Sequence, residues 1–342
     1  MKKRAIVSAV ATLLCASVLG SCTGISNKIA FKDYWNEDSI SMQSIDETLV
    51  YDITFKKSEA SFQSSYSIDY KAGTYTTHLV STTHTDGKAA YIYTTDLQID
   101  VTYTFQGESV TKHDFITTES LFYSEDYALR PISSKKTFLN HSPTGGTATS
   151  LAECYTIAAY TVETKYTADG KSGATTVTLN PVKEGDQPIV DTPNTFEIDT
   201  EDYNYLDNEQ LLLALRALPA TTSSANVLVY SPFVEAVQTI NIATATTTNA
   251  NTTSETDASE PFFYTVNGIV PEKGRKVAYR TLTLSIDDAN PGATQTAWIA
   301  KMTDPAKNTN RNVILHLETP LAYALGTLVY DLRSADYKTA TP

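Results

Sequence analysis

Cysteine is scarce in this chain, with 3 among 342 residues. So few cysteines exclude a disulfide framework of the kind that staples small exported domains. Cys154 sits in a strand-like context, where we expect a small buried hydrophobe. The sequence around it predicts neither the base nor the positive surroundings that a nucleophilic thiol needs.

Basic residues are also fewer than acidic ones. Lysine and arginine number 26 against 39 aspartates and glutamates, which leaves a formal net charge of −13. Proteins that bind nucleic acid carry a basic footprint, so we expect no nucleic-acid partner. The same charge argues against docking on anionic lipid by electrostatics alone.

Recognisable catalytic, cofactor and metal motifs are missing from the sequence. No histidine has another histidine or a cysteine at zinc-ligand spacing. His113 and Asp114 adjoin in an expected strand, which sends their side chains to opposite faces. There is no Gly-x-Ser-x-Gly elbow, phosphate loop or dinucleotide fingerprint. We therefore expect no catalytic residue, no cofactor and no metal, in a protein that is not an enzyme.

A long apolar run occurs once, at the N-terminus. Lys2, Lys3 and Arg4 precede the apolar run 5–19, which ends in Leu19-Gly20-Ser21-Cys22. A basic start, an apolar run and a small-residue cleavage site make a secretory signal. The run is shorter than the roughly 20 residues that a membrane span needs.

With a cysteine at its last position, this stretch resembles the lipobox of bacterial lipoprotein precursors. The resemblance implies that the chain is cut before Cys22, which is diacylated on its sulfur with fatty acids such as palmitate. It further implies an anchor in the cell membrane or outer membrane, facing outside the cytoplasm. The alternative is an ordinary signal peptide with a chance cysteine near its end.

The composition that remains favours β structure. Charged residues make up 19% of the chain, below the usual quarter, whereas tyrosine alone contributes 21 residues. Aromatic and β-branched residues suit a pleated sheet. We divide the chain into a signal peptide (1–21), a lipidated cysteine with a lead-in (22–46), an N-terminal antiparallel β domain (47–180), a linker rich in Pro, Asp and Glu (181–206) and a C-terminal β domain that opens with a helix (207–342).

Alternation of apolar and polar residues is clearest from Tyr91 to Phe105. A strand of that length would extend about 50 Å and would have to twist and curl. Asp86-Gly87 predicts a tight hairpin before it, and Gln106-Gly107 predicts another turn into a partner over 109–122. The stretch through Arg130-Pro131 to Pro143 and Gly146 lacks this alternation, so we expect it to be irregular.

One helix is expected, at the start of the C-terminal half. Asp207 can cap it with Gln210 at the third helical position, and Pro219 stops it. Further strands are expected at 225–230, 262–266, 276–286, 294–301, 312–317 and 322–332, with a flexible polar loop at 249–260.

Tyr91, Tyr93 and Tyr103 share the inward face of the long strand. They could face an apolar or glycan ligand inside a curled sheet, or they could simply fill its core. The core-filling alternative has the greater weight, because aromatic stripes in β proteins mostly pack.

The expected fold class is therefore mainly β, in two antiparallel halves. The first is a long-stranded meander or half-open barrel, the second is a smaller sheet domain, and one short helix accompanies them. The first shape is similar, by architecture alone, to bacterial envelope carriers of lipoproteins and lipids. We expect a lipid-anchored envelope protein that binds an apolar or glycan ligand or an envelope protein. The alternatives are a structural or adhesive surface protein and, least favoured, a hydrolase of envelope polymers.

Overall fold

The structure is a computed structural model of the chain. It describes residues 28–31, 45–58, 65–123, 129–144, 147–183, 185–198, 203–219, 221–244, 254–257, 265–266, 276–286, 294–300, 312–322 and 325–339. Cys22 and the expected signal peptide lie outside these residues, so lipidation stays a prediction.

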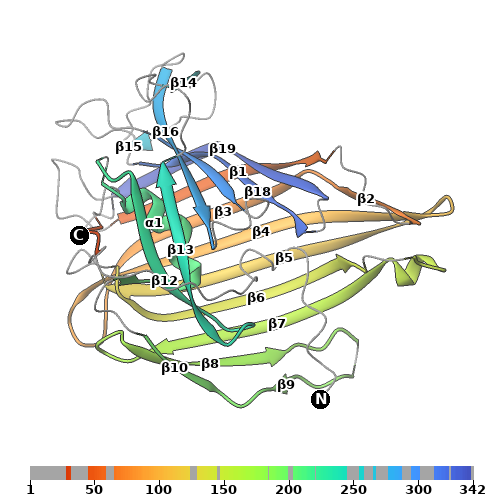
Figure 1. Cartoon of the computed structure of the whole chain (residues 1–342), viewed down its shortest axis with the longest axis horizontal. Helices are drawn as coiled ribbons and strands as arrows, with labels where there is room; N and C mark the ends of the chain where they lie inside the picture. Colours follow the sequence, from red (N-terminus) through yellow and green to blue (C-terminus); the bar gives the residue numbers. More distant parts are fainter. Residues whose placement is uncertain are drawn as a thin grey trace.

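The described strands form one sheet of 19 strands (Figure 1). The first half contributes β1 (Ile45–Lys57), β2 (Ser67–Tyr70), β3 (Gly73–Thr83), β4 (Ala89–Phe105), β5 (Glu108–Tyr123), β6 (Pro131–Pro143), β7 (Tyr155–Tyr166) and β8 (Ser172–Leu179). The short strands β9 (Ile189–Val190), β10 (Asn194–Glu197) and β11 (Asn204–Tyr205) follow. The second half contributes β12 (Ser224–Ser231), β13 (Ala236–Thr244), β14 (Ser254–Asp257), β15 (Thr265–Val266), β16 (Lys276–Ser285), β17 (Gln295–Ala300), β18 (Ile314–Pro320) and β19 (Gly326–Thr339).

Helices are few and short in the described part of the chain: η1 (Leu151–Glu153), η2 (Asn208–Gln210) and α1 (Leu211–Ala217). Strand pairing is antiparallel except for β11 with β12 and β15 with β19. The mainly β fold class with one short helix is confirmed.

Strand β1 joins the two halves of the chain. It pairs with β3 on one side and with β19 on the other, from Ile45↔Thr339 to Lys57↔Gly326. The two expected β domains thus share one continuous sheet. The expected linker 181–206 itself contains β9 and β10, both paired with β8, and β11, which pairs with β12. Whether either half folds by itself stays a prediction.

The hairpin of β4 and β5 follows the sequence pattern closely. β4 has 17 residues and pairs with β5 from Ala90↔Tyr123 to Phe105↔Glu108. Gln106 and Gly107 have φ angles of 49° and 90°, the positive values that a type I′ turn requires at both central positions. The apolar face of β4 is buried, as its alternation predicted.

The expectation of an irregular stretch after β5 is wrong. Residues 131–143 form β6, which pairs with β5 and with β7. Its sequence lacks alternation because buried polar side chains occupy its C-terminal part and bond to one another. Asn140 Nδ2 donates to Ser142 Oγ over 2.8 Å, and the buried Asp114 carboxylate accepts from the His141 backbone over 3.0 Å. Pairing on both sides overrides the local pattern.

The expected loop at 249–260 also needs correction, because β14 lies within it and pairs with β16. Strand β13 was not expected from the sequence, although β12 and β13 form a regular antiparallel pair. The strands expected around 225–230, 276–286, 294–301 and 312–317 are present as β12, β16, β17 and β18.

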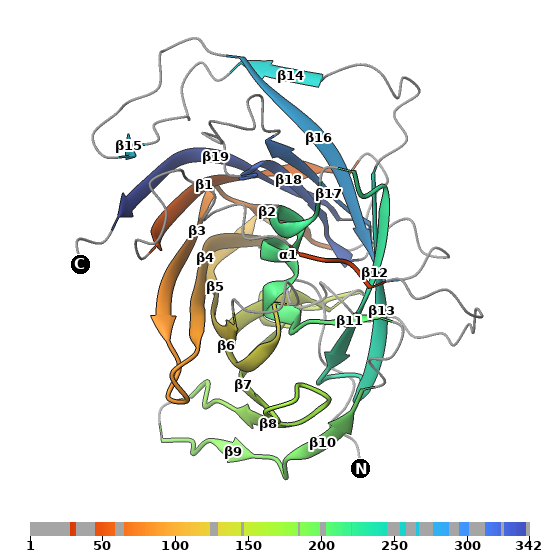
Figure 2. The same ribbon diagram turned by 90° about the vertical axis from the view of Figure 1, so that its left-hand side faces the viewer.

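The sheet curls around α1, which lies inside it (Figure 2). The helix begins where the sequence predicted: Asp207 and Gln210 form the capping box, and the Asp207 carboxylate accepts from the Glu209 backbone over 2.8 Å. Six of its seven residues are buried, Arg216 among them. A helix that is buried on nearly all sides belongs to a core.

An aromatic cluster joins the two ends of the curled sheet. Phe196 on β10 stacks on Tyr230 on β12 with ring centroids 4.1 Å apart. Tyr166 on β7 meets Tyr205 on β11 edge-on at 5.5 Å. These ring contacts hold the edge formed by β8 to β10 against the edge formed by β11 and β12. Among the described strands, side-chain packing, and not strand pairing, therefore bridges the two ends of the curled sheet.

Candidate functional site

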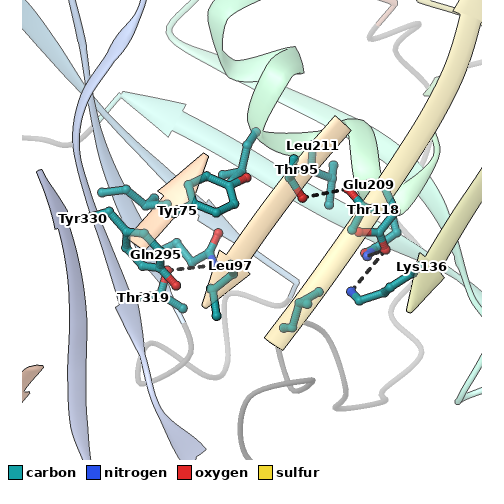
Figure 3. A pocket seen from close by; sticks show the side chains of 14 residues that line it. Tyr75, Thr95, Leu97, Thr118, Lys136, Glu209, Leu211, Gln295, Thr319 and Tyr330 are labelled. Carbon is teal, nitrogen blue, oxygen red and sulfur yellow. Dashed lines mark hydrogen bonds and ion pairs between the residues drawn. The ribbon is translucent and has the colours of Figure 1, made fainter. Parts of the chain in front are cut away.

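A cavity of about 90 Å³ lies between the η2–α1 segment and the inner face of the sheet (Figure 3). It is lined by Tyr75, Thr95, Leu97, Ile116, Thr118, Lys136, Asn208, Glu209, Leu211, Leu212, Gln295, Leu317, Thr319 and Tyr330. These residues come from β3 to β6, from the helical segment and from β17 to β19. Both halves of the chain are therefore needed to build it.

Apolar side chains form most of the cavity wall. Leu97 and Ile116 are paired residues on β4 and β5, and Leu211 and Leu212 approach from the helix. Thr95 interrupts the apolar inward face of β4, and its hydroxyl shares a hydrogen bond of 2.7 Å with Thr118. One hydroxyl donates to the other, so each of these two oxygens has a hydrogen-bond partner.

One end of the cavity carries charge. Lys136 Nζ donates to Glu209 Oε1 over 3.2 Å, and the two side chains are only 14% and 13% exposed. Asn208 donates to the same Glu209 oxygen over 2.9 Å. Lys136, Asn208 and Glu209 also line a second cavity of about 40 Å³, which reaches Tyr230 and Phe233. The ion pair therefore stands between two neighbouring spaces.

The other end is polar but uncharged. Gln295 is 3% exposed and donates from Nε2 to Thr319 Oγ1 over 3.3 Å. Its Oε1 is buried and finds no hydrogen-bond partner among the residues that the structure describes. Tyr330 lies beside this pair, and burial raises the pKa of its hydroxyl far above the ordinary value, which keeps it neutral.

A third, small cavity of about 10 Å³ adjoins the first and shares Tyr75, Leu212, Leu317 and Tyr330 with it. Arg216 closes this space from the helix. Its guanidinium binds the Glu47 carboxylate on β1 through two hydrogen bonds of 2.6 and 2.9 Å. The exposed fractions are 2% for Arg216 and 1% for Glu47. The pair fixes the helix against the sheet, and with it one wall of the cavity.

Asp207 holds the start of the helical segment beside the second cavity. Its carboxylate accepts from Ser134 Oγ over 2.7 Å and from the Tyr166 hydroxyl. Burial raises the pKa of this carboxyl above its ordinary value, and the nearby Glu209 carboxylate raises it further. The hydrogen bonds act in the opposite direction but do not cancel the burial.

The three tyrosines expected to face a ligand are all buried, with 3%, 4% and 0% exposure for Tyr91, Tyr93 and Tyr103. Tyr93 lines the small third cavity. Tyr91 packs on Phe122 with centroids 5.6 Å apart. Tyr103 donates its hydroxyl to the His141 carbonyl. The structure thus places them in the core, and their contact with a ligand stays a prediction.

The histidines take part in separate pairs. His113 Nδ1 bonds Asp100 over 2.8 Å on the exposed face, while His141 Nδ1 bonds the buried Asp114 over 2.6 Å. His113 and Asp114 therefore do point apart. Within the described residues, no group of three or more His, Cys, Asp or Glu side chains could hold a metal ion. Nor does any helix of that part have the length and apolar character to cross a membrane.

Sequence reasoning missed the residues that shape this cavity. Gln295 and Thr319 lie in different strands, and Lys136 belongs to the strand that was expected to be irregular. One signal was present, because Thr95 is a hydroxyl residue within the otherwise apolar inward face of β4. That position marks where the cavity lies.

No family model matches the chain, and no curated protein matches it. Among solved structures, it resembles a β-barrel-like protein of a domain of unknown function, DUF1849, from Brucella abortus. The TM-score is 0.44 at 10% sequence identity, over 87% of this chain and all of the other.

Proposed function

We propose that this protein is a lipid-anchored envelope protein that binds, without catalysis, a ligand with a thin apolar chain inside its half-open barrel. The observation that carries the proposal is the apolar cavity between η2–α1 and the sheet. The lipobox-like stretch ending at Cys22 supports a position outside the cytoplasm.

The size of the cavity limits the ligand. At about 90 Å³ it is smaller than a cavity of about 150 Å³ that holds benzene. Two smaller cavities adjoin it, one at each end, through shared lining residues. A thin hydrocarbon chain suits the main cavity better than a bulky ring system does. The buried Lys136–Glu209 pair separates that cavity from the second one, and the third holds only about 10 Å³.

Binding suits the lining better than catalysis does. The wall is mostly apolar, and its polar groups stand at opposite ends. Lys136 and Glu209, its two charged lining residues, neutralise each other. General acid–base chemistry needs groups converging on one reacting atom, and this lining offers none.

Native mass spectrometry with lipid extracts tests the proposal, using the mature chain and two tryptophan variants. Leu97→Trp fills the cavity from the inward face of β4. Ile92→Trp places the same ring on the same strand but on the opposite face, so it serves as the matched control.

The wild-type protein and Ile92→Trp should retain a lipid-derived mass and melt at a higher temperature with it. Leu97→Trp should lose at least about tenfold in affinity, because its ring occupies the ligand space. The proposal fails if the wild type retains nothing, or if a folded Leu97→Trp variant binds as well as the control.

A second candidate ligand is a glycan, and a groove on the outer face favours it. This groove of about 340 Å³ crosses β3 to β6 and is lined by threonines together with His78, Asp96, Glu119 and Lys135. Incubation with envelope glycans, followed by the same mass measurement, tests it. Glycan retention abolished by Glu119→Gln and Lys135→Gln, but unaffected by Leu97→Trp, would assign the ligand to this groove.

A further inference from the structure

From the geometry of Gln295 we infer that the cavity takes an apolar chain ending in an uncharged hydrogen-bond donor, such as a hydroxyl, rather than a carboxylate. This inference rests on the proposed function and specifies the chemistry of its ligand. The donor would bind Gln295 Oε1.

The Gln295 amide oxygen is buried without a hydrogen-bond donor among the described residues. The residue as a whole is only 3% exposed. A buried acceptor without a donor loses its hydration and gains nothing in return. A donor supplied by a ligand would remove this cost, so the site favours ligands that carry one.

A hydrogen bond to Thr319 orients the Gln295 amide. Gln295 Nε2 donates to Thr319 Oγ1 over 3.3 Å, and the same Thr319 hydroxyl interacts with Tyr330. This contact holds the amide nitrogen against Thr319. The amide therefore leaves its other atom, the acceptor Oε1, without a partner among the described residues, in a side chain that lines the cavity.

The charges that line the cavity disfavour an anion beside Gln295. Lys136 is the sole positive group among the lining residues, and Glu209 already neutralises it. Figure 3 shows both on the opposite side of the cavity from Gln295, Thr319 and Tyr330. A carboxylate beside Gln295 would meet an acceptor oxygen and lose its hydration, both of which oppose binding.

The test compares three small probes that share one hydrocarbon chain: 1-hexanol, 1-chlorohexane and hexanoate. Chemical-shift titration of the full mature chain gives an affinity for each. Gln295→Met removes the acceptor at nearly constant length, and Gln98→Met makes the same change on the outer face of β4 as the control.

The affinity for 1-hexanol relative to that for 1-chlorohexane should be about tenfold higher in the wild type and in Gln98→Met than in Gln295→Met. The ratio is the readout because 1-chlorohexane leaves water more readily than the alcohol does, whichever variant binds it. Hexanoate should bind most weakly, and Gln295→Met should still bind 1-chlorohexane. The same affinity ratio in the wild type and in Gln295→Met would overturn the inference and leave the apolar cavity as a binding site. Binding of none of the probes would contradict both the inference and the proposed function.

Discussion

The buried ion pair between Glu47 and Arg216 should be the most sensitive point of the fold. Two hydrogen bonds of 2.6 and 2.9 Å join the groups, and both residues are almost fully buried. Glu47→Gln keeps the shape of the side chain but leaves the Arg216 charge uncompensated inside the barrel. Removing one partner of a buried pair costs about 3–5 kcal/mol, so the free energy of unfolding should fall by that amount.

Urea unfolding followed by circular dichroism measures this loss, and the melting temperature should fall on the order of 10 °C with it. The matched control is Glu163→Gln, which breaks the exposed Lys135–Glu163 pair at 2.9 Å. An exposed pair contributes less than about 1 kcal/mol, so this variant should unfold nearly as the wild type does.

A double variant separates charge from packing. Glu47→Leu combined with Arg216→Met removes both charges and keeps apolar bulk, so it should be more stable than Glu47→Gln. The reasoning is refuted if Glu47→Gln costs no more than Glu163→Gln. It is also refuted if the double variant loses as much stability as the single one.

Two further predictions concern the anchor and the helix cap. Cys22→Ala should release the protein from membranes and abolish labelling by radioactive palmitate. Cys15→Ala should change neither, because Cys15 lies within the apolar run 5–19 that is expected to be removed with the signal peptide. A Cys22→Ala protein that stays on the membrane would contradict the lipobox interpretation. Burial raises the pKa of the Asp207 carboxyl above 3.8 in the folded state. The folded state therefore holds this proton more tightly than the unfolded state does. The contribution of Asp207 to the free energy of unfolding decreases as pH rises through the raised pKa. Asp207→Asn keeps a good cap but cannot titrate, so its urea unfolding between about pH 4 and about pH 7 should lack this decrease; an unchanged slope would contradict the assignment.

Local patterns predicted the elements whose geometry is set by neighbouring residues. The hairpin of β4 and β5 follows from alternation and from the Gln106-Gly107 turn, because both act over a few residues. The helix start follows from Asp207 and Gln210 for the same reason. β6 escaped prediction because the partners of its buried polar groups, such as Asp114, lie far away in the sequence.

The candidate site was beyond sequence reasoning for a related cause. Lys136 and Glu209 are 73 residues apart, and Gln295 and Thr319 are 24 apart on different strands. Lys136 and Glu209 meet only when the helical segment packs inside the curled sheet, and Gln295 and Thr319 meet only when β17 pairs with β18. No local spacing rule connects such residues. The cavity is defined by these meetings, so its lining could be read only from the folded chain.

By itself, the sequence determined the β character of the chain, the long hairpin and the capped helix, and it predicts an export signal with its cysteine. Each depends on periodicity or on short-range stereochemistry, which the order of residues contains directly. Only the tertiary structure decided that β1 joins β19, that α1 lies inside the sheet, and that a glutamine whose amide oxygen is unpaired among the described residues lines a cavity there. These depend on contacts between distant segments, which are set by the packing of the whole sheet.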